Sequence, residues 1–233
     1  MRFRHADAIW SAHPLLTAGC LYADGVDAHA DISARLAPYT ARAAARLAAA
    51  PEGEFPEVTA WRRTFSGLGL RPTQYRCAAE SLLRRLRKEG RLPRIHPVVD
   101  LCNALSVAYA VPVAALDADR ITGPLLEVRP AHGDEVYTAF GGAIEHPAPG
   151  EVTFTDSAGR AHARRWTHRQ SGFSAVGPDT RRILVVTEAV HDGGAQTVPA
   201  LLKSLAAELA AHWPVVTSDA VLTAGAPEFT FGD

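Results

Sequence analysis

The chain changes character at Pro112, and this change limits the folds open to it more than any other feature of the sequence. Before Pro112 the sequence predicts mainly helices, whereas after it short apolar runs are separated by Gly, Pro and Asp. Short runs of this kind indicate strands joined by turns. The regular strand–helix alternation of a doubly wound fold is absent, so we expect an α+β fold with a mixed sheet and flanking helices.

The expected elements begin with a strand at residues 15–25. Helices are then predicted at residues 30–50, 57–66, 72–90 and 97–110. Pro38 should interrupt the first of them, and Gly90 should end the third. A closing helix covers residues 197–213. Between Pro112 and that helix, the strand-like segments are LLEVRPA (125–131), EVYTAF (135–140), EVTFTD (151–156), ARRWTHRQ (163–170) and RRILVVTEAV (181–190).

Composition limits which cellular compartment and which kinds of binding partner are expected for the protein. The chain is 47% hydrophobic with a formal net charge of −1, so any basic surface that binds nucleic acid must be local. Its three cysteines are far apart and form no CxxC pair, which favours reduced thiols in a cytoplasm. The N-terminal residues lack the apolar stretch of a signal peptide, and no long apolar window predicts a membrane span. We therefore expect a soluble, cytoplasmic protein without a membrane partner.

The strongest local charge lies between Arg71 and Arg94. Eight cations in this segment face only Glu80 and Glu89, which makes it a candidate phosphate-binding surface. The alternative is a solvated helix face whose arginines pair with carboxylates elsewhere in the fold. The candidate RNA contacts are Arg76, Arg84, Arg85, Arg87, Lys88 and Arg91.

The predicted helix at 97–110 carries Asp100, Asn103 and Ser106 along one stripe, among apolar neighbours. Polar groups on a buried helix need partners, because an unpaired one costs about 1–3 kcal/mol. Either a structural hydrogen-bond network or a ligand pocket would supply those partners.

A second polar segment spans residues 164–171. In a strand, Trp166, His168 and Gln170 would face one side, and Arg165, Arg169 and Ser171 the other. Trp166 can stack on a base or fill the core, and the core is the commoner place for tryptophan. The ten histidines show no ligand spacing, and no nucleotide-binding glycine motif is present, so we expect no metal and no cofactor.

Several short motifs that are weak individually occur along the chain in an order that is more specific than any one of them. Between residues 72 and 212 the chain resembles the B3/B4 domain of bacterial phenylalanyl-tRNA synthetase β subunits. The matching pieces are Val99–Asn103, Pro112, Asp117–Gly123, Val128–Ala131, Asp134–Glu135 and Phe140–Gly142. The resemblance implies a single domain over residues 1–233, with a family-like core at about 72–212 and an N-terminal strand-and-helix extension at 1–71.

In the family, this domain is a layered β/β/α unit that hydrolyses wrongly attached amino acid from tRNA, with water as nucleophile and without cofactor or metal. The resemblance therefore implies a trans-acting aminoacyl-tRNA deacylase, with tRNA rather than DNA as its partner. The alternatives are a non-catalytic tRNA- or nucleotide-binding module and a small-molecule domain that no longer acts on tRNA. The family's Gly-rich loop falls about where this chain has residues 164–171, so the pocket should differ in size and polarity, and tyrosine specificity is not carried over.

We expect the helix at 97–110 and the segment at 164–171 to face each other across one pocket. The expected catalytic residues are Asn103, Ser106, His168 and Gln170. The expected substrate-binding residues are Asp117, Glu135, Arg165, Trp166 and Ser171. Among these, Asn103 and Ser106 would position water or the ammonium group of the amino acid. Arg165 and Gln170 would contact the 3′-terminal nucleotide or the oxyanion, and Asp117 or Glu135 could also bind the ammonium group.

Overall fold

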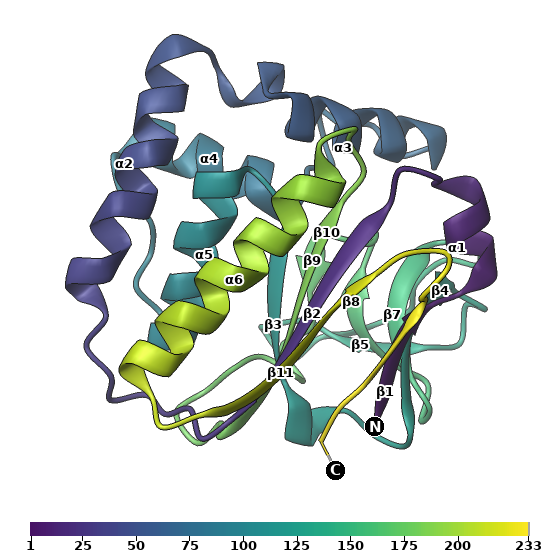
Figure 1. Ribbon diagram of the computed structural model, residues 1–233. Coiled ribbons are helices and arrows are strands. Elements are labelled where there is room, and N and C mark those ends of the chain that lie inside the picture. The colour runs from purple at the N-terminus through teal and green to yellow at the C-terminus, as the bar shows by residue number, and fades with distance from the viewer. Residues whose placement is uncertain (233) are drawn as a thin grey trace.

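The computed structural model describes residues 1–232, which form two stacked sheets with most of the helices on one side (Figure 1). The small sheet is antiparallel and has the strand order β11-β2-β10-β3. Its strands are β2 (Thr17–Asp24), β3 (Val113–Asp117), β10 (Arg182–Ala189) and β11 (Val216–Leu222).

The large sheet is mixed and has the strand order β12-β1-β4-β7-β8-β5-β6, with the short strand β9 paired to β8. Two of its pairs are parallel, β1 with β4 and β5 with β8. Its strands are β1 (Arg2–His5), β4 (Leu125–Pro130), β5 (Val136–Thr138), β6 (Ile144–Glu145), β7 (Val152–Asp156), β8 (Arg160–Arg164), β9 (Arg169–Gln170) and β12 (Glu228–Thr230).

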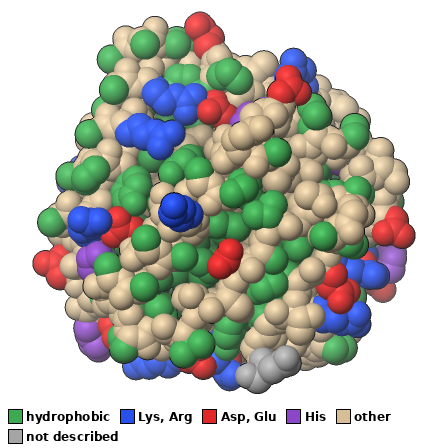
Figure 2. Space-filling model, in the orientation of Figure 1, with side chains coloured by type: hydrophobic (Ala, Val, Ile, Leu, Met, Phe, Trp, Pro, Cys, Tyr) green, Lys and Arg blue, Asp and Glu red, His purple; other side chains and the backbone are tan. Residues whose placement is uncertain are grey.

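Six α-helices accompany the sheets within the described residues. They are α1 (Asp7–Ala12), α2 (Ser33–Ala49), α3 (Pro56–Gly67), α4 (Ala78–Glu89), α5 (Pro97–Tyr109) and α6 (Gly194–His212). Two 3-10 turns, η1 (Glu52–Glu54) and η2 (Ala118–Arg120), connect other elements. No helix in residues 1–232 has the length and apolarity needed to cross a membrane. On the face shown in Figure 2, hydrophobic side chains run across the middle, and charged side chains lie both among them and toward the edge.

The small sheet separates two apolar cores because its side chains alternate between its faces. Val185 and Ala115 belong to one core, with Leu101 of α5 and side chains of α6. Leu116 and Val186 belong to the other, with side chains of the large sheet. The layers are therefore helices, small sheet and large sheet, which confirms the expected α+β, β/β/α fold.

The N-terminal residues belong to both sheets. Strand β1 lies between β4 and β12 in the large sheet, and β2 lies between β10 and β11 in the small one. Gly19 of β2 lets α6 approach, since a Cβ at this position would lie 2.7 Å from Val198 and 2.9 Å from Leu202. The first strands therefore help to hold the layers together.

Three local predictions are wrong. Helix α2 continues through Pro38 in its second turn; the position is exposed, so water can bind the carbonyl of Ala34, which loses its helical partner. Helix α4 begins at Ala78 rather than at Pro72, because Cys77 caps it by accepting a hydrogen bond from the Glu80 amide. The segment at 163–170 is not one strand, because β8 ends at Arg164 and the chain turns before β9.

Candidate functional site

A small cavity lies between the two sheets, against the turn that joins β8 to β9. Its volume is about 70 Å³, and because Trp166 forms part of its wall it is named the Trp166 cavity. Strands β3 and β10 of the small sheet and β7 and β8 of the large sheet contribute to the walls. The lining residues are Ala78, Pro112, Val113, Ala114, Leu116, Phe154, His162, Ala163, Trp166, Thr167, His168, Arg169, Gln170, Val186 and Glu188.

The turn beside the cavity has a strained backbone. Arg165 and Trp166 are consecutive residues with left-handed φ angles of 49° and 57°. Side chains of this size rarely adopt this conformation, which costs on the order of 1–3 kcal/mol per residue unless the surroundings impose it. Here the amide of Trp166 donates to the carbonyl of Val152 over 2.7 Å, and the Ala78 amide donates to the carbonyl of Thr167 over 2.8 Å. Strain retained in this way is typical of functional loops.

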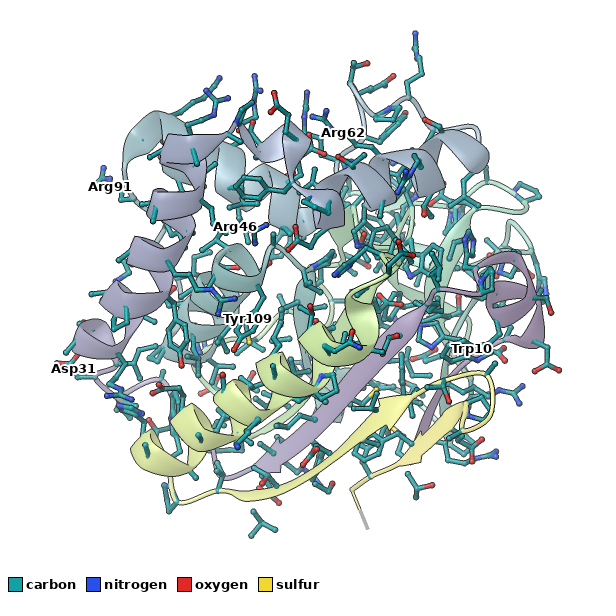
Figure 3. The ribbon with its side chains drawn as sticks, turned by 45° about the horizontal axis from the view of Figure 1, so that its top comes forward. Trp10, Asp31, Arg46, Arg62, Arg91 and Tyr109 are labelled. Carbon is teal, nitrogen blue, oxygen red and sulfur yellow. The ribbon has the colours of Figure 1, made fainter. Side chains whose placement is uncertain are left out.

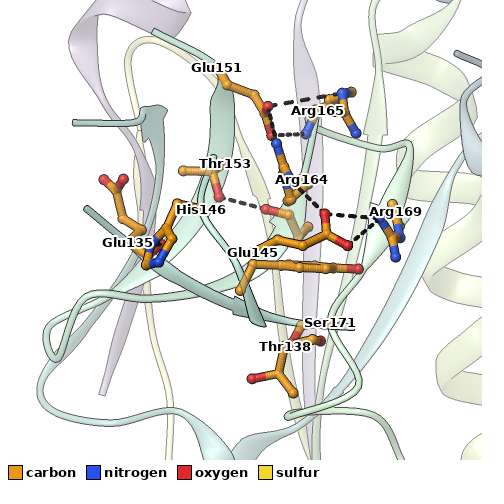
Figure 4. A network of polar contacts seen from close by, with 12 residues as sticks. Glu135, Thr138, Glu145, His146, Glu151, Thr153, Arg164, Arg165, Arg169 and Ser171 are labelled. Atoms are coloured by element: carbon orange, nitrogen blue, oxygen red, sulfur yellow. Dashed lines mark hydrogen bonds and ion pairs between the residues drawn. The ribbon is translucent and has the colours of Figure 1, made fainter. Parts of the chain in front are cut away.

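Two glutamates fix the arginines around this turn (Figure 4). Arg164, which is 7% exposed, binds both oxygens of Glu151 over 2.9 Å and also contacts Glu145 over 2.6 Å. Glu151 accepts a third hydrogen bond from the amide of Arg165, and Arg169 contacts Glu145 over 3.0 Å. Burial by itself would raise the pKa of Glu151, but its hydrogen bonds to Arg164 outweigh this effect and lower the pKa. The network holds the turn in one conformation.

A buried carboxylate, Glu188, forms part of the cavity wall. It is 2% exposed, and its Oε1 accepts a hydrogen bond of 2.7 Å from the indole Nε1 of Trp166. The same oxygen lies 2.6 Å from Nε2 of His5. Buried carboxylates occur in proteins only where they are paired in this way, so these contacts explain how Glu188 is tolerated between the sheets.

Two histidines line the cavity, and they differ in the hydrogen-bond partners of their ring nitrogens. His162 is fully buried, with Nδ1 2.8 Å from the Ser174 hydroxyl and Nε2 3.1 Å from Asp156. Both of its ring nitrogens are therefore occupied. The Nδ1 of His168 donates to the carbonyl of Arg76 over 2.8 Å. Burial lowers the pKa of His168 below its usual 6.5, so the ring is neutral at pH 7 and its lone pair lies on Nε2.

Thr167 adds an unused polar group. Its hydroxyl oxygen is buried, and no hydrogen-bond partner for it exists within residues 1–232. Buried polar groups are almost always hydrogen-bonded, so this hydroxyl is free to pair with a ligand or water that reaches it.

The structure brings three of the predicted site residues to this cavity, namely Trp166, His168 and Gln170. The side-chain amide of Gln170 donates to the carbonyl of Ala115 over 2.8 Å and so ties β9 to β3. Trp166 is fully buried and packs edge-on against Trp61. Trp166 therefore fills the core, the commoner of the two alternatives for this residue, and leaves no exposed ring face on which a base could stack.

Arg165 and Ser171 lie beside the cavity but not in its wall. The guanidinium of Arg165 stacks on the ring of Tyr75 at 4.7 Å, and Tyr75 also meets the ring of His168 edge-on at 5.3 Å. Ser171 is fully buried, and its hydroxyl donates to the carbonyl of Thr138 over 2.8 Å. Ser171 therefore joins β9 to β5.

The expected pocket between α5 and the 164–171 segment does not form. Helix α5 packs on one face of the small sheet, whereas the Trp166 cavity lies on its other face. Asn103 is half-buried on α5 and does not line the cavity. Ser106 is fully buried, and its hydroxyl donates to the carbonyl of Val111 over 2.8 Å at the end of the helix. The prediction from the polar stripe was wrong because sequence spacing does not show which face of a sheet a helix covers.

Asp117 and Glu135 also lie elsewhere. Asp117 accepts hydrogen bonds from the hydroxyl of Thr180 and the amide of Asp119, and does not line the Trp166 cavity. Glu135 lies in a separate polar cavity of about 450 Å³ on the large sheet, with Arg129 and His132. Neither carboxylate is therefore placed to meet a ligand in the Trp166 cavity.

The one group of potential metal ligands within residues 1–232 is His132, Asp134 and Glu135, whose ligand atoms lie within 4.8 Å of one another. Glu135 accepts hydrogen bonds from the amides of His132 and Gly133 and, over 2.6 Å, from Arg129. Burial by itself would raise the pKa of Glu135, but these hydrogen bonds lower it to about 2. The guanidinium already neutralises the carboxylate, so this group is a poor cation site.

The basic segment is partly neutralised by local carboxylates. Arg84 and Arg87 contact the buried Glu52, at 3.7 Å and 2.7 Å. Arg76 contacts Glu80 at 3.2 Å, and Arg85 contacts Glu89 at 3.1 Å.

Lys88 and Arg91 are exposed and, unlike the other predicted RNA contacts, have no ion-pair partner in the part of the chain that the structure describes. Within residues 1–232, no carboxylate lies within 4.0 Å of either one. Figure 3 shows Arg91 at the outer edge of the helical layer, pointing away from the protein. These two side chains are the best placed of the predicted phosphate contacts.

Sequence reasoning missed Glu188, Thr167 and His162. A signal for Glu188 was present, since a single carboxylate follows the apolar run at 183–186 in a segment that predicts a buried strand. Nothing in the sequence distinguishes Thr167 or His162 from other polar residues, because their roles depend on what the second sheet places beside them.

The fold and the site define a class of protein, an α+β domain with a small polar-walled cavity between two stacked sheets. The family model of the B3/4 domain matches residues 60–197, which is more than half of the chain, and the chain belongs to this family. Every residue that lines the Trp166 cavity lies within the matched range.

Among solved structures, the chain is similar to an N-terminal fragment of the phenylalanyl-tRNA synthetase β-subunit from Pyrococcus horikoshii, with 10% identity and a TM-score of 0.45. The alignment covers 94% of this chain and 53% of that chain, so this chain spans about half of the fragment's length. A search of curated proteins found no match.

Proposed function

We propose that this protein is an aminoacyl-tRNA deacylase acting in trans, which hydrolyses the ester bond of a mischarged or non-cognate aminoacyl-tRNA at the Trp166 cavity. Membership of the B3/4 family supports a tRNA-related role. The observation that carries the proposal is the set of polar groups in one small cavity: a buried carboxylate, a neutral histidine and an unsatisfied hydroxyl.

His168 would hold and activate the attacking water. Because its Nδ1 donates to the carbonyl of Arg76, its Nε2 is the nitrogen that accepts a proton. The water adds to the ester carbonyl, and the 3′-oxygen of the terminal ribose leaves with a proton. The free amino acid and the uncharged tRNA are the products.

Glu188 and Thr167 would bind the amino acid. The α-ammonium group of an aminoacyl ester is positive, so the buried carboxylate of Glu188 is its natural partner in the wall. The Thr167 hydroxyl would donate to the carbonyl oxygen, where negative charge develops during hydrolysis. This assignment gives each of the two groups a partner from the substrate.

Cations beside the cavity would hold the RNA. Arg169 lines the cavity and has a 41% exposed side chain, and Arg165 stacks on Tyr75 nearby. Such guanidinium and aromatic groups suit the phosphates and bases of a single-stranded 3′ end. Lys88 and Arg91 would contact the tRNA body.

The experiment is a deacylation screen in which the purified protein is incubated with tRNAs charged with different amino acids and the loss of ester is followed. At least one aminoacyl-tRNA should be hydrolysed faster than its spontaneous rate. Glu188→Gln should reduce that rate about 100-fold, as expected for loss of a positioned charged contact. Glu228→Gln, on the edge strand β12, is the matched control and should keep the wild-type rate.

Binding of tRNA without hydrolysis of any charged tRNA would contradict the proposal and favour the non-catalytic tRNA-binding module. A wild-type deacylation rate in Glu188→Gln would show that Glu188 does not bind the substrate.

A further inference from the structure

We infer that the Trp166 cavity accepts amino acids with small side chains and excludes aromatic ones, and that Trp166 sets this limit. The inference rests on the proposed function, because it takes the cavity as the place where the amino acid of the ester binds. It concerns the size of the side chain, which the proposed chemistry leaves open.

The volume of the cavity decides the size class. It measures about 70 Å³. An engineered protein cavity that admits benzene measures about 150 Å³, and typical small-molecule pockets span about 300–1,000 Å³. The ring of phenylalanine or tyrosine therefore has no room here, whereas a side chain of one or a few heavy atoms does.

Trp166 is not free to move aside. Its side chain is fully buried, Nε1 is bonded to Glu188 over 2.7 Å, and the ring packs edge-on against Trp61 at a centroid distance of 5.1 Å. Its backbone amide is also bonded, to Val152 over 2.7 Å. A side chain held at both ends cannot change rotamer without breaking these contacts, so the wall is fixed before the substrate arrives.

The other apolar walls of the cavity are buried as well. Leu116 of β3, Phe154 of β7 and Val186 of β10 all line the cavity, and they are 1%, 3% and 2% exposed. They come from both sheets, so the cavity can widen only if the sheets separate. A larger substrate side chain would have to displace close-packed atoms, which protein interiors tolerate poorly.

The test is a binding comparison that requires no hydrolysis. The probes are 3′-alanylamino-3′-deoxyadenosine and 3′-phenylalanylamino-3′-deoxyadenosine, whose amide bonds replace the ester, and affinity is measured by calorimetry. The alanyl probe should bind at least about tenfold more tightly, within the range by which apolar pockets discriminate size. Equal binding, preference for the phenylalanyl probe, or binding of neither would overturn the inference. Because the amides are not cleaved, this result is independent of whether the protein is a deacylase.

Two wall variants then test the role of Trp166. Trp166→Phe and Leu116→Ala should each enlarge the cavity and reduce the preference for the alanyl probe at least about threefold, because each removes buried atoms from the cavity wall. Phe140→Ala is the control, since Phe140 is 73% exposed and lies outside the cavity.

Leu116→Ala keeps the size argument testable if Trp166→Phe does not fold, as judged by circular dichroism. An unchanged preference in a folded Trp166→Phe would show that Trp166 does not set the limit, and an unchanged preference in Leu116→Ala would show that the cavity does not hold the side chain.

Discussion

The indole Nε1 of Trp166 donates a 2.7 Å hydrogen bond to Glu188 Oε1, the same oxygen that lies 2.6 Å from Nε2 of His5. These contacts join the strained turn after β8, the central strand β10 and the N-terminal strand β1. The carboxylate therefore links the two sheets at the cavity wall, and its environment should govern both stability and chemistry.

Trp166→Phe should lower the free energy of unfolding by at least about 1.5 kcal/mol, because it removes a hydrogen bond to a buried carboxylate. The matched control is Trp213→Phe, in which a 3.1 Å bond to the neutral backbone carbonyl of Asp27 is lost. That loss should be about 0.5–1.5 kcal/mol. Urea unfolding of the three proteins measures both values. Equal losses for the two variants would show that the carboxylate adds nothing to the contact.

The deacylation rate should fall as the pH drops below 6.5, because protonation of His168 removes the lone pair that accepts a proton from water. Burial lowers the pKa of His168 below 6.5, so the rate should be insensitive to this group at neutral pH. Rates corrected for spontaneous hydrolysis, measured between about pH 5 and 8, test this. His168→Gln should abolish the acid limb, whereas His29→Gln, at an exposed loop position, should retain it.

The same shift affects stability. A histidine whose folded-state pKa is depressed binds its proton more tightly in the unfolded chain. The stability that His168 contributes is therefore present above its unfolded pKa of about 6.5 and is lost as the pH falls through the lowered folded value. The difference in free energy of unfolding between the wild-type protein and His168→Gln should therefore shrink as the pH falls. A difference that grew on acidification would contradict this prediction.

Replacing Lys88 and Arg91 with Ala should weaken tRNA binding and make it less dependent on salt. The slope of log affinity against log salt should become shallower by about 1.4–1.8, since each of the two lost phosphate contacts removes about 0.7–0.9. Filter binding at several salt concentrations measures the slope. Lys203→Ala, on α6, is the control. Arg87→Ala is less informative, because it leaves the carboxylate of Glu52, which is 4% exposed, without its 2.7 Å partner and should destabilise the fold. An unchanged salt slope in the double variant would show that Lys88 and Arg91 do not contact RNA.

Activity should survive exhaustive EDTA treatment. Glu135 already carries three hydrogen bonds, including one from the Arg129 guanidinium, so the His132 group should not retain a cation. Metal analysis of the purified protein and deacylation after dialysis check this. Stoichiometric zinc lost together with activity would overturn it and make the histidines ligands.

Much of the fold was predictable because it depends on local pattern. The helix at Pro97–Tyr109 was predicted from Pro97 and the apolar residues that follow, and β10 from the run at 181–190. The motif order from Val99 to Gly142 predicted the family, which the match at 60–197 confirms. Three residues of the predicted site, Trp166, His168 and Gln170, do line one cavity.

What the sequence could not determine depends on contacts between distant segments. The stripe of Asn103 and Ser106 was visible, but only the packing of α5 on the far face of the small sheet separates it from the cavity. The arginines near residue 84 were visible, but their pairing with Glu52 depends on how η1 meets α4. Sequence spacing fixes which residues share a helix face or a strand face, because that follows from backbone geometry. Which two faces meet, and so whether Glu188 has His5 and Trp166 beside it, is decided only when the sheets stack, because burial of a carboxylate is tolerated only where its partners converge.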